Sequence, residues 1–413
     1  MRILFTTRGS AGHVMPLAPF GLAAQRAGHE VLVAAQRQHE ANVARTGLAC
    51  TLTDDPDPSI FPELQARFAR LAIEPANDAM VAEYFARFDT EAMLPALREV
   101  AETWQPDVIV REAWEYGSTI VADLYDIPIV RVGLGLACLE ERSIALAAPA
   151  VDEARADAGL PSDPDGDRMR ATPLYTMMPA ALETPGSTPP GIRRFAQAEP
   201  VLTPRDSAPL PDWWPGNADP LVYLSLGSVA GKPHMAYFPE LYRRAIDALA
   251  PLPIRLLATL GDAPDPGALG PLPANVHVAR WVPQEAVLPH AAVAVSHGGY
   301  GSTLGALAHG VPLVVLPLFS MDQWVNAEAV QRVGAGIALG ADHASRAVMD
   351  LPDGRTLDGL APAVVQLLDA SAARGRAGEI AAAMAALPPV EGAIAELAAI
   401  RDAPRPWRRA AAW

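Results

Sequence analysis

A glycine-rich turn in the second half of the sequence has the residue types of an anion-binding site. The apolar run 293–296 leads directly into the segment 297–303 (His-Gly-Gly-Tyr-Gly-Ser-Thr), after which a helical pattern continues to Gly310. Free backbone N–H groups at the start of a helix attract a phosphate, and glycines let it approach the backbone closely. We therefore expect a phosphate site here. Its expected contacts are His297, Gly299, Gly301, Ser302 and Thr303.

Two further polar segments follow predicted strands in the same half. Trp281-Val282-Pro-Gln284 ends the strand pattern 276–281, and Asp322-Gln323 follows the strand pattern 313–317. An indole can stack on a flat base while Gln284 reads the edge of that base, and a carboxylate with an amide can hold sugar hydroxyls. Because ligands of open α/β sheets bind at the carboxyl ends of the strands, we expect these segments to meet at the phosphate turn.

In this order, the three segments resemble the nucleotide-diphospho-sugar motif of family 1 glycosyltransferases, especially bacterial enzymes that glycosylate macrolides and other natural products. Leu4–Gly28 and Leu221–Ser228 are also similar to that family, and the resemblance adds Gly227 and Ser228 to the expected donor contacts. The resemblance implies a GT-B fold, in which two Rossmann-like, doubly wound parallel-sheet domains face each other across a cleft. It places the donor on the C-terminal domain and the acceptor on the N-terminal domain, and it implies that a C-terminal helix, here about 394–407, crosses back to the first domain.

The resemblance also assigns a catalytic base. His13 follows a glycine at the start of a predicted helix, and a histidine titrates in the range that suits proton removal from a hydroxyl. In the family the matching histidine is the base, and an acidic residue after a later strand orients it. The matching residue here is Glu112, where the family usually has Asp, although the adjacent Arg111 could instead neutralise it.

Aromatic residues at helical spacing in segment 60–104 are more often core residues than ligand contacts, but an insertion of this length after an early strand could also form the wall of an apolar acceptor pocket. The expected acceptor contacts are Ser10, Phe61, Phe85, Phe88 and Trp114.

Short apolar runs that alternate with helical patterns predict an α/β protein with parallel sheets buried on both faces. The predicted strands are 2–7, 30–35, 107–112, 129–134, 221–227, 255–260, 276–281, 293–296, 313–317 and 336–339. Segment 162–220 is rich in proline and glycine and has the composition of a linker region. We expect an acceptor domain at 1–205, a linker at 206–220, a donor domain at 221–393 and a returning C-terminal segment at 394–413.

The composition excludes several classes of protein. A net charge of −15 argues against a nucleic-acid surface. Lys232 is the only lysine and does not lie in a P-loop. Two isolated cysteines and the absence of a signal or membrane segment predict a cytoplasmic protein. We expect it to be either a monomer or a homodimer. The pairs Asp55/Asp57 and Asp163/Asp165 lie in proline-containing turns, so we expect no metal site and no cofactor.

Together these features predict an inverting glycosyltransferase that moves a sugar from a nucleoside diphosphate to a hydroxyl of a hydrophobic polyketide, macrolide or aromatic aglycone. Gly305 stands where the family commonly has a Glu that binds both ribose hydroxyls, which favours a dTDP-sugar over a UDP-sugar. A catalytically silent helper or binding protein of the same family is an alternative. An NAD-dependent oxidoreductase fits less well, because the glycines at 9 and 12 do not form G-x-G-x-x-G and the strand 30–35 ends without a ribose-binding acid.

Overall fold

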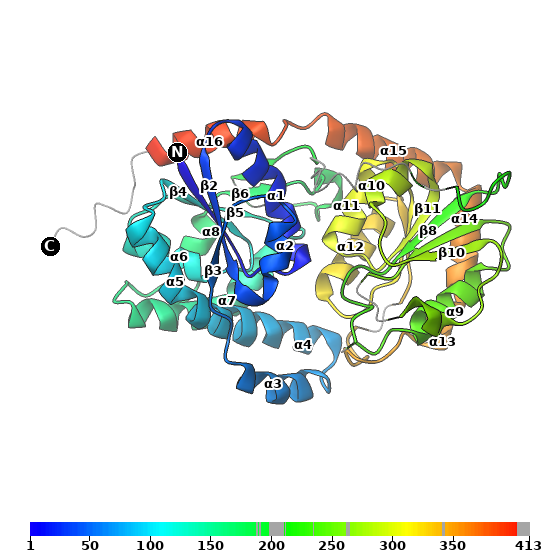
Figure 1. Ribbon diagram of the computed structural model, residues 1–413, viewed down its shortest axis with the longest axis horizontal. Helices are drawn as coiled ribbons and strands as arrows, with labels where there is room; N and C mark the ends of the chain where they lie inside the picture. Colours follow the sequence, from blue (N-terminus) through cyan, green and yellow to red (C-terminus); the bar gives the residue numbers. More distant parts are fainter. Residues whose placement is uncertain are drawn as a thin grey trace.

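The chain forms two parallel β-sheets that lie side by side, each with helices on both faces (Figure 1). The computed structural model describes residues 1–402 apart from 187, 188, 190, 198–209, 211, 234, 262–264 and 341–342. Of the predicted linker, residues 206–209 and 211 lie outside the described residues, as do residues 403–413 of the predicted returning segment.

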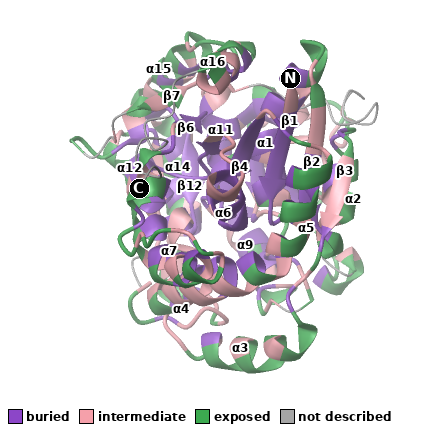
Figure 2. Ribbon diagram, turned by 90° about the vertical axis from the view of Figure 1, so that its left-hand side faces the viewer, coloured by how far each residue is buried: buried purple, intermediate pink, exposed green. Residues whose placement is uncertain are grey.

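The first sheet has seven strands in the order β3-β2-β1-β4-β5-β6-β7, all parallel within the described residues. The strands are β1 (Arg2–Thr7), β2 (Glu30–Gln36), β3 (Cys50–Thr53), β4 (Val108–Glu112), β5 (Ile129–Val132), β6 (Leu174–Thr176) and β7 (Ile192–Arg194). The helices are α1 (Ala11–Arg26), α2 (Glu40–Ala44), α3 (Phe61–Phe68), α4 (Ile73–Ala79), the π-helix η3 (Met80–Asp89), α5 (Thr90–Thr103), α6 (Gly117–Leu124), α7 (Ala137–Asp157) and α8 (Asp167–Ala171). Helices cover both faces, so β1 and β4 are almost completely buried (Figure 2).

The second sheet has six strands in the order β10-β9-β8-β11-β12-β13. The strands are β8 (Leu221–Ser225), β9 (Arg255–Thr259), β10 (Val276–Ala279), β11 (Ala291–Ser296), β12 (Leu313–Val315) and β13 (Gly336–Ala338). The helices are α9 (Glu240–Leu249), α10 (Gln284–Val287), α11 (Tyr300–Ala308), α12 (Met321–Arg332), α13 (Gly354–Asp358), α14 (Leu360–Asp369), α15 (Ser371–Ala385) and α16 (Glu391–Asp402). Short 3₁₀ turns join some elements: η1 (Arg37–His39), η2 (Pro58–Ile60), η4 (Ala180–Leu182), η6 (Pro266–Leu269) and η7 (Leu288–His290).

The α/β prediction with two parallel sheets is confirmed, and all ten predicted strands are present, β1 with its predicted ends and the other nine with shifted ends. The sequence analysis did not predict β3, β6 or β7. The last two lie inside segment 162–220, so the interpretation of that whole segment as a linker region was wrong. These strands are only three or four residues long, too short for a clear apolar pattern. β3 and β7 are the two edge strands, where polar residues are tolerated, and β6 lies next to β7.

The two halves share one hydrophobic core cluster. Val14 and Leu17 of α1 belong to the same cluster as Tyr300 and Leu304 of α11, which fixes the first helix after β1 against the helix after β11. Helix α16 lies against α1, where Glu391 pairs with Arg26 at 2.6 Å. The carboxyl ends of β1 and β11 are therefore turned toward the same space between the sheets. Among the described residues, no helix is both long enough and apolar enough to span a bilayer.

Candidate active site

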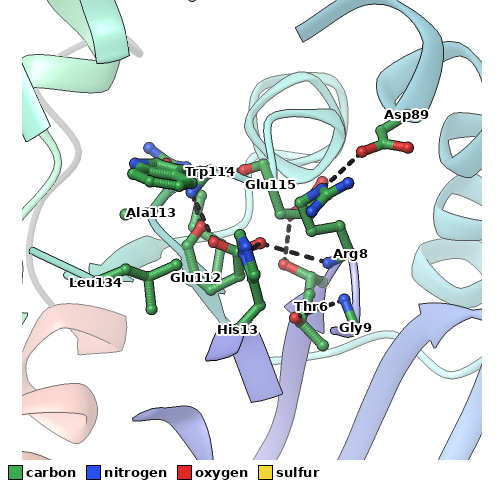
Figure 3. A network of polar contacts seen from close by, with 12 residues as sticks. Thr6, Arg8, Gly9, His13, Asp89, Glu112, Ala113, Trp114, Glu115 and Leu134 are labelled. Carbon is green, nitrogen blue, oxygen red and sulfur yellow. Dashed lines mark hydrogen bonds and ion pairs between the residues drawn. The ribbon is translucent and has the colours of Figure 1, made fainter. Parts of the chain in front are cut away.

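His13 and Glu112 meet at the ends of two neighbouring strands. β1 pairs with β4 in parallel and Thr6 lies opposite Arg111, so Glu112 at the end of β4 lies beside the turn that follows β1. His13 is the third residue of α1, and its Nδ1 lies 2.9 Å from Glu112 Oε1 (Figure 3). The structure therefore brings together the two residues that the resemblance assigned to catalysis, and the longer Glu side chain reaches the histidine.

Both carboxylate oxygens of Glu112 are held inside the protein, where the side chain has no exposed surface. Oε1 also accepts a long 3.4 Å bond from the Arg8 N–H, and Oε2 accepts one of 2.7 Å from the Trp114 N–H. Burial by itself would raise the pKa of Glu112, but His13, the Trp114 N–H and the Arg8 charge outweigh it and hold the pKa below its usual value. An ionised Glu112 keeps the proton of His13 on Nδ1, which leaves the lone pair on Nε2 free.

Arg8 supports this pair from the other side. Its Nε donates to Asp89 Oδ2 at 2.7 Å, and its guanidinium carbon lies 3.8 Å from the centre of the Phe85 ring. Gln36 Nε2 donates to the second oxygen of Asp89 at 2.6 Å. These contacts fix the π-helix η3 over the strand ends. Sequence reasoning missed Arg8, although a charged residue next to a buried strand was a usable signal.

The five expected acceptor residues differ in position. Phe85 and Trp114 stack with ring centres 5.9 Å apart, and both present edges to His13, whose ring centre lies 6.1 Å from Phe85 and 5.5 Å from Trp114. Ser10 precedes α1, and its carbonyl accepts the His13 N–H. Phe61 is 43% exposed on α3 and its ring packs against Tyr84, while Phe88 packs against the same core cluster as Phe85 and Trp114.

The predicted phosphate turn links β11 to α11. Gly298 has φ +88°, its N–H donates to Ser296 Oγ at 3.0 Å, and its carbonyl accepts a 2.8 Å bond from the buried Asn326. The turn is therefore fixed before any ligand binds. Asn326 is a second residue that sequence reasoning missed.

The ring of His297 fills the space between two glycines. A Cβ on Gly227 or Gly299 would lie 2.6 Å or 2.5 Å from atoms of this ring, so both positions require glycine while the ring stays in place. Burial lowers the pKa of His297 to about 4, so the ring is neutral at pH 7 and offers a donor without a charge.

The hydroxyl groups of the turn are not equally accessible. Ser302 is half-buried in the first turn of α11, and Ser228 is exposed just beyond Gly227. Thr303 has no exposed surface, and its hydroxyl has no protein partner. Gly301 is exposed at the start of the helix, where unpaired N–H groups remain for an anion.

The expected base-binding residues lie at the end of β10. The Trp281 ring is 49% exposed, and Val282 and Gln284 are half-buried. Gln284 Nε2 donates to the Gly301 carbonyl at 3.2 Å, which joins the base-binding end to the phosphate turn. A Cβ on Gly305 would lie 2.6 Å from the same Nε2, so Gly305 makes room for the Gln284 side chain.

Asp322 and Gln323 begin α12. Burial raises the pKa of Asp322, and the hydrogen bond from the Ser320 hydroxyl partly offsets this increase. Gln323 is only 2% exposed, and its Oε1 accepts from the N–H groups of Leu318 and Phe319 at 2.7 and 3.1 Å. Its carbonyl oxygen therefore holds the preceding loop, and its Nε2 is the group left for a ligand.

Both Asp-Pro-Asp pairs stabilise local turns. Asp57 Oδ1 accepts from the Ser59 N–H at 2.9 Å, and Asp163 accepts from the N–H groups of Asp167 and Arg168 at 3.0 and 3.1 Å. In the part of the chain that the structure describes, no three His, Cys, Asp or Glu side chains form a group that could hold a metal ion.

Comparison with protein families matches both halves of the chain. Residues 22–179 match the N-terminal domain, and residues 243–400 the C-terminal domain, of the family described as erythromycin biosynthesis protein CIII-like. The chain is 32% identical over 358 residues to L-demethylnoviosyl transferase of Streptomyces niveus, which covers 83% of this chain and 86% of that protein. It is 30% identical over 414 residues to 4'-demethylrebeccamycin synthase of Lentzea aerocolonigenes, an alignment that covers 85% of this chain and 92% of that protein.

Solved structures show the same fold. The glycosyltransferase SnogD from Streptomyces nogalater superposes with a TM-score of 0.74 and 26% identity over 97% of this chain and 99% of that chain. The glycosyltransferase VinC, solved in complex with dTDP, superposes with a TM-score of 0.76 and 23% identity over 97% of this chain and 100% of that chain. The GT-B prediction is therefore confirmed. The chain belongs to the erythromycin biosynthesis protein CIII-like family of natural-product glycosyltransferases.

Proposed function

We propose that the protein is an inverting O-glycosyltransferase that transfers a sugar from a nucleoside diphosphate to a hydroxyl of a hydrophobic natural product. The observation that carries this proposal is the bond between His13 Nδ1 and the buried, ionised Glu112 at 2.9 Å. This bond leaves Nε2 of His13 as a proton acceptor beside the aromatic rings of Phe85 and Trp114.

In this proposal the reaction is a single displacement. Nε2 of His13 removes the proton of the acceptor hydroxyl, whose oxygen forms a bond to the anomeric carbon while the bond from that carbon to the diphosphate breaks. Glu112 stabilises the imidazolium that forms. The start of α11, with the hydroxyls of Ser302 and Thr303 and the N–H of neutral His297, receives the negative charge on the leaving diphosphate. One displacement on one face inverts the anomeric centre.

We assign the acceptor to the first half of the chain, within 1–205, and the donor to 221–393. Trp281 stacks on the base, Gln284 contacts its edge, and Asp322 with Nε2 of Gln323 holds the sugar. The missing carboxylate at Gly305 favours a deoxyribose donor, so we propose a dTDP-sugar. The dTDP present in the VinC structure, whose fold this chain shares, agrees with that choice. The reaction as proposed needs no metal ion and no cofactor.

The acceptor is proposed to be a polyketide, macrolide or aromatic aglycone. The stacked Phe85 and Trp114 beside His13 provide an apolar, aromatic wall for such a molecule. The relatives include proteins named 4'-demethylrebeccamycin synthase, aclacinomycin-T 2-deoxy-L-fucose transferase and elloramycin glycosyltransferase, which supports an acceptor from a natural-product pathway.

The test is a donor-by-acceptor screen read by mass spectrometry, followed by His13→Ala on a productive pair with an unactivated alcohol. Loss of the base should lower kcat about 10²–10⁴-fold, while affinity for the free nucleoside diphosphate stays unchanged. His29→Ala is the matched control, since His29 lies beyond the far end of α1, next to the N-terminus. Turnover by His13→Ala near that of His29→Ala would reject His13 as the base.

A further inference from the structure

A segment of the first half of the chain is attached to the second half close to Asp322. The N–H of Ile73, at the start of α4, donates to the carbonyl of Arg346 at 3.0 Å, and Ala72 forms an antiparallel bridge with Ala347. In Figure 1, α4 extends from below the first sheet toward the second half of the molecule. These backbone bonds hold the amino end of α4 against the C-terminal half.

Asn77, one turn further along α4, uses its whole side-chain amide in this contact. Its Nδ2 donates to the carbonyl of Phe319 at 2.9 Å and to the carbonyl of Ile73 at 2.8 Å. Its Oδ1 accepts from the N–H of Met321 at 3.0 Å. Because one donor group and one acceptor are both engaged across the two halves, the orientation of the amide is fixed.

The contact with Met321 satisfies a backbone N–H that α12 itself leaves unpaired. Ser320 occupies the N-cap position of α12 in an extended conformation, but its side chain caps no backbone N–H and donates instead to Asp322. The first N–H of α12 is therefore satisfied by Asn77, from the other half of the chain. Asp322 is the second residue of that helix, so its position depends on where this first turn is held.

We propose that Asn77 is a positioning residue that orders the start of α12, and with it Asp322, for the donor sugar. The site for the sugar is then complete only when the segment 72–77 is docked on residues 319–321 and 346–347. This inference rests on the proposed role of Asp322 in holding the sugar. It links the occupancy of the donor site to the element that continues through η3 to the acceptor wall at Phe85.

The matched control is Asn275, which is also half-buried and whose Nδ2 also donates to two carbonyls, those of Ala250 and Ile254, each at 3.0 Å. It precedes β10, at the end of the second sheet opposite to the ligand-binding ends. Asn275→Ala therefore removes an equivalent pair of bonds without touching α12.

The first measurement is amide hydrogen exchange of the full chain by mass spectrometry, and it does not depend on any function. Asn77→Ala should speed exchange in peptides covering 318–323, and Asn275→Ala should not. Unchanged exchange there in folded Asn77→Ala would overturn the inference. Asn77→Asp should also speed it, since the second carboxylate oxygen would face the carbonyls of Ile73 and Phe319, and slow exchange in this variant would contradict the two-sided contact.

The second measurement compares the affinities for dTDP-glucose and for dTDP by calorimetry. Loss of a cap weakens a helix start by an amount that corresponds to about 3- to 30-fold, so Asn77→Ala should bind dTDP-glucose that much more weakly while binding dTDP as the wild type does. An equal loss for both ligands, or no loss for either, would overturn the inference. Asp322→Ala distinguishes the positioning role of Asn77 from the sugar-binding role of Asp322. If Asp322→Ala also leaves the affinity for dTDP-glucose unchanged, the proposed role of Asp322 is wrong, and the role of Asn77 in positioning it for the sugar is wrong with it.

Discussion

Replacement of Glu112 by Gln tests the proposed mechanism more directly than removal of the base, because the two side chains have the same shape. In the structure Oε2 of Glu112 accepts from the Trp114 N–H at 2.7 Å, so the amide oxygen of Gln must take that position. The NH₂ group then faces His13 Nδ1, which must accept a hydrogen bond instead of donating one. The proton of the neutral imidazole moves to Nε2, where the lone pair for catalysis was.

The expected loss follows from the interaction removed. A charge-assisted hydrogen bond in a buried site contributes about 1.5–3 kcal/mol, and the transition state, in which His13 is an imidazolium, loses that contribution. At about 1.4 kcal/mol per factor of ten, kcat/KM should fall about 10- to 150-fold from this bond alone. The reversed tautomer adds to the loss, so the effect of Glu112→Gln should approach that of His13→Ala.

The assay is kcat/KM with a saturating donor and an unactivated alcohol acceptor, and Glu115→Gln is the control. Glu115 is also buried and lies three residues away, but its Oε1 accepts from the backbone N–H of Ser118, where the oxygen of Gln can remain. Its Oε2 accepts from the hydroxyls of Thr6 and Ser118, which can rotate to accept from an amide. The double variant His13→Ala/Glu112→Gln should be no slower than His13→Ala. Activity of Glu112→Gln within about threefold of Glu115→Gln would refute the reasoning, as would strict additivity in the double variant.

Three further outcomes are expected. EDTA should leave sugar transfer essentially intact, and added Mg²⁺ should change the rate little. A loss of activity in EDTA that Mg²⁺ or Mn²⁺ restores would contradict the proposal that the start of α11 stabilises the leaving diphosphate. Gly305→Glu should shift the ratio of kcat/KM for UDP-glucose to that for dTDP-glucose toward UDP-glucose by about ten-fold. Gly305→Ala controls for displacement of the Gln284 side chain. An unchanged ratio in a folded Glu variant would count against the inference that the residue at position 305 selects the donor through its ribose. Burial raises the pKa of Glu140 from 4.5 to about 7, and Arg131 offsets part of this effect. Because the folded state then holds this proton more tightly than the unfolded state, the free energy of unfolding should fall as the pH rises from 4.5 through about 7. Thermal unfolding should show Glu140→Gln gaining on the wild type between pH 5 and pH 8, and a constant difference would reject this pKa.

The long apolar strands could be predicted from the sequence because parallel strands covered on both faces must be apolar throughout. β1 begins and ends where the sequence places it, since Ile3, Leu4 and Phe5 are all fully buried. β7, Ile-Arg-Arg, has no such pattern, because it lies at the sheet edge and its arginines reach Glu183 and Glu396. A short edge strand held by one neighbouring strand and by ion pairs leaves no periodic signal.

The site residues on strand ends were also predictable, because the parallel register fixes what they meet. Glu112 follows the residue that pairs with Thr6, so its meeting with the turn before His13 follows from strand order alone, across 99 residues of chain. Arg8 was not predictable in the same way. Its partners Phe85 and Asp89 lie on the π-helix η3, whose placement over the strand ends depends on side-chain packing rather than on sheet register.

Gln323 and Asn77 show that residue type and position along the chain do not reveal every partner of a polar side chain near a ligand site. An amide placed after a strand suggested a sugar contact, yet the carbonyl oxygen of Gln323 is used by two backbone N–H groups of its own loop. The amide of Asn77 lies in an aromatic helical segment that suggested only acceptor packing, yet it reaches the carbonyl of Phe319 and the N–H of Met321. Buried backbone groups at loop and helix ends must be paired, and in this protein amide side chains pair them. The positions proposed to hold the sugar are therefore fixed by residues that need not touch it, and such residues are found by following each backbone N–H and carbonyl to its partner.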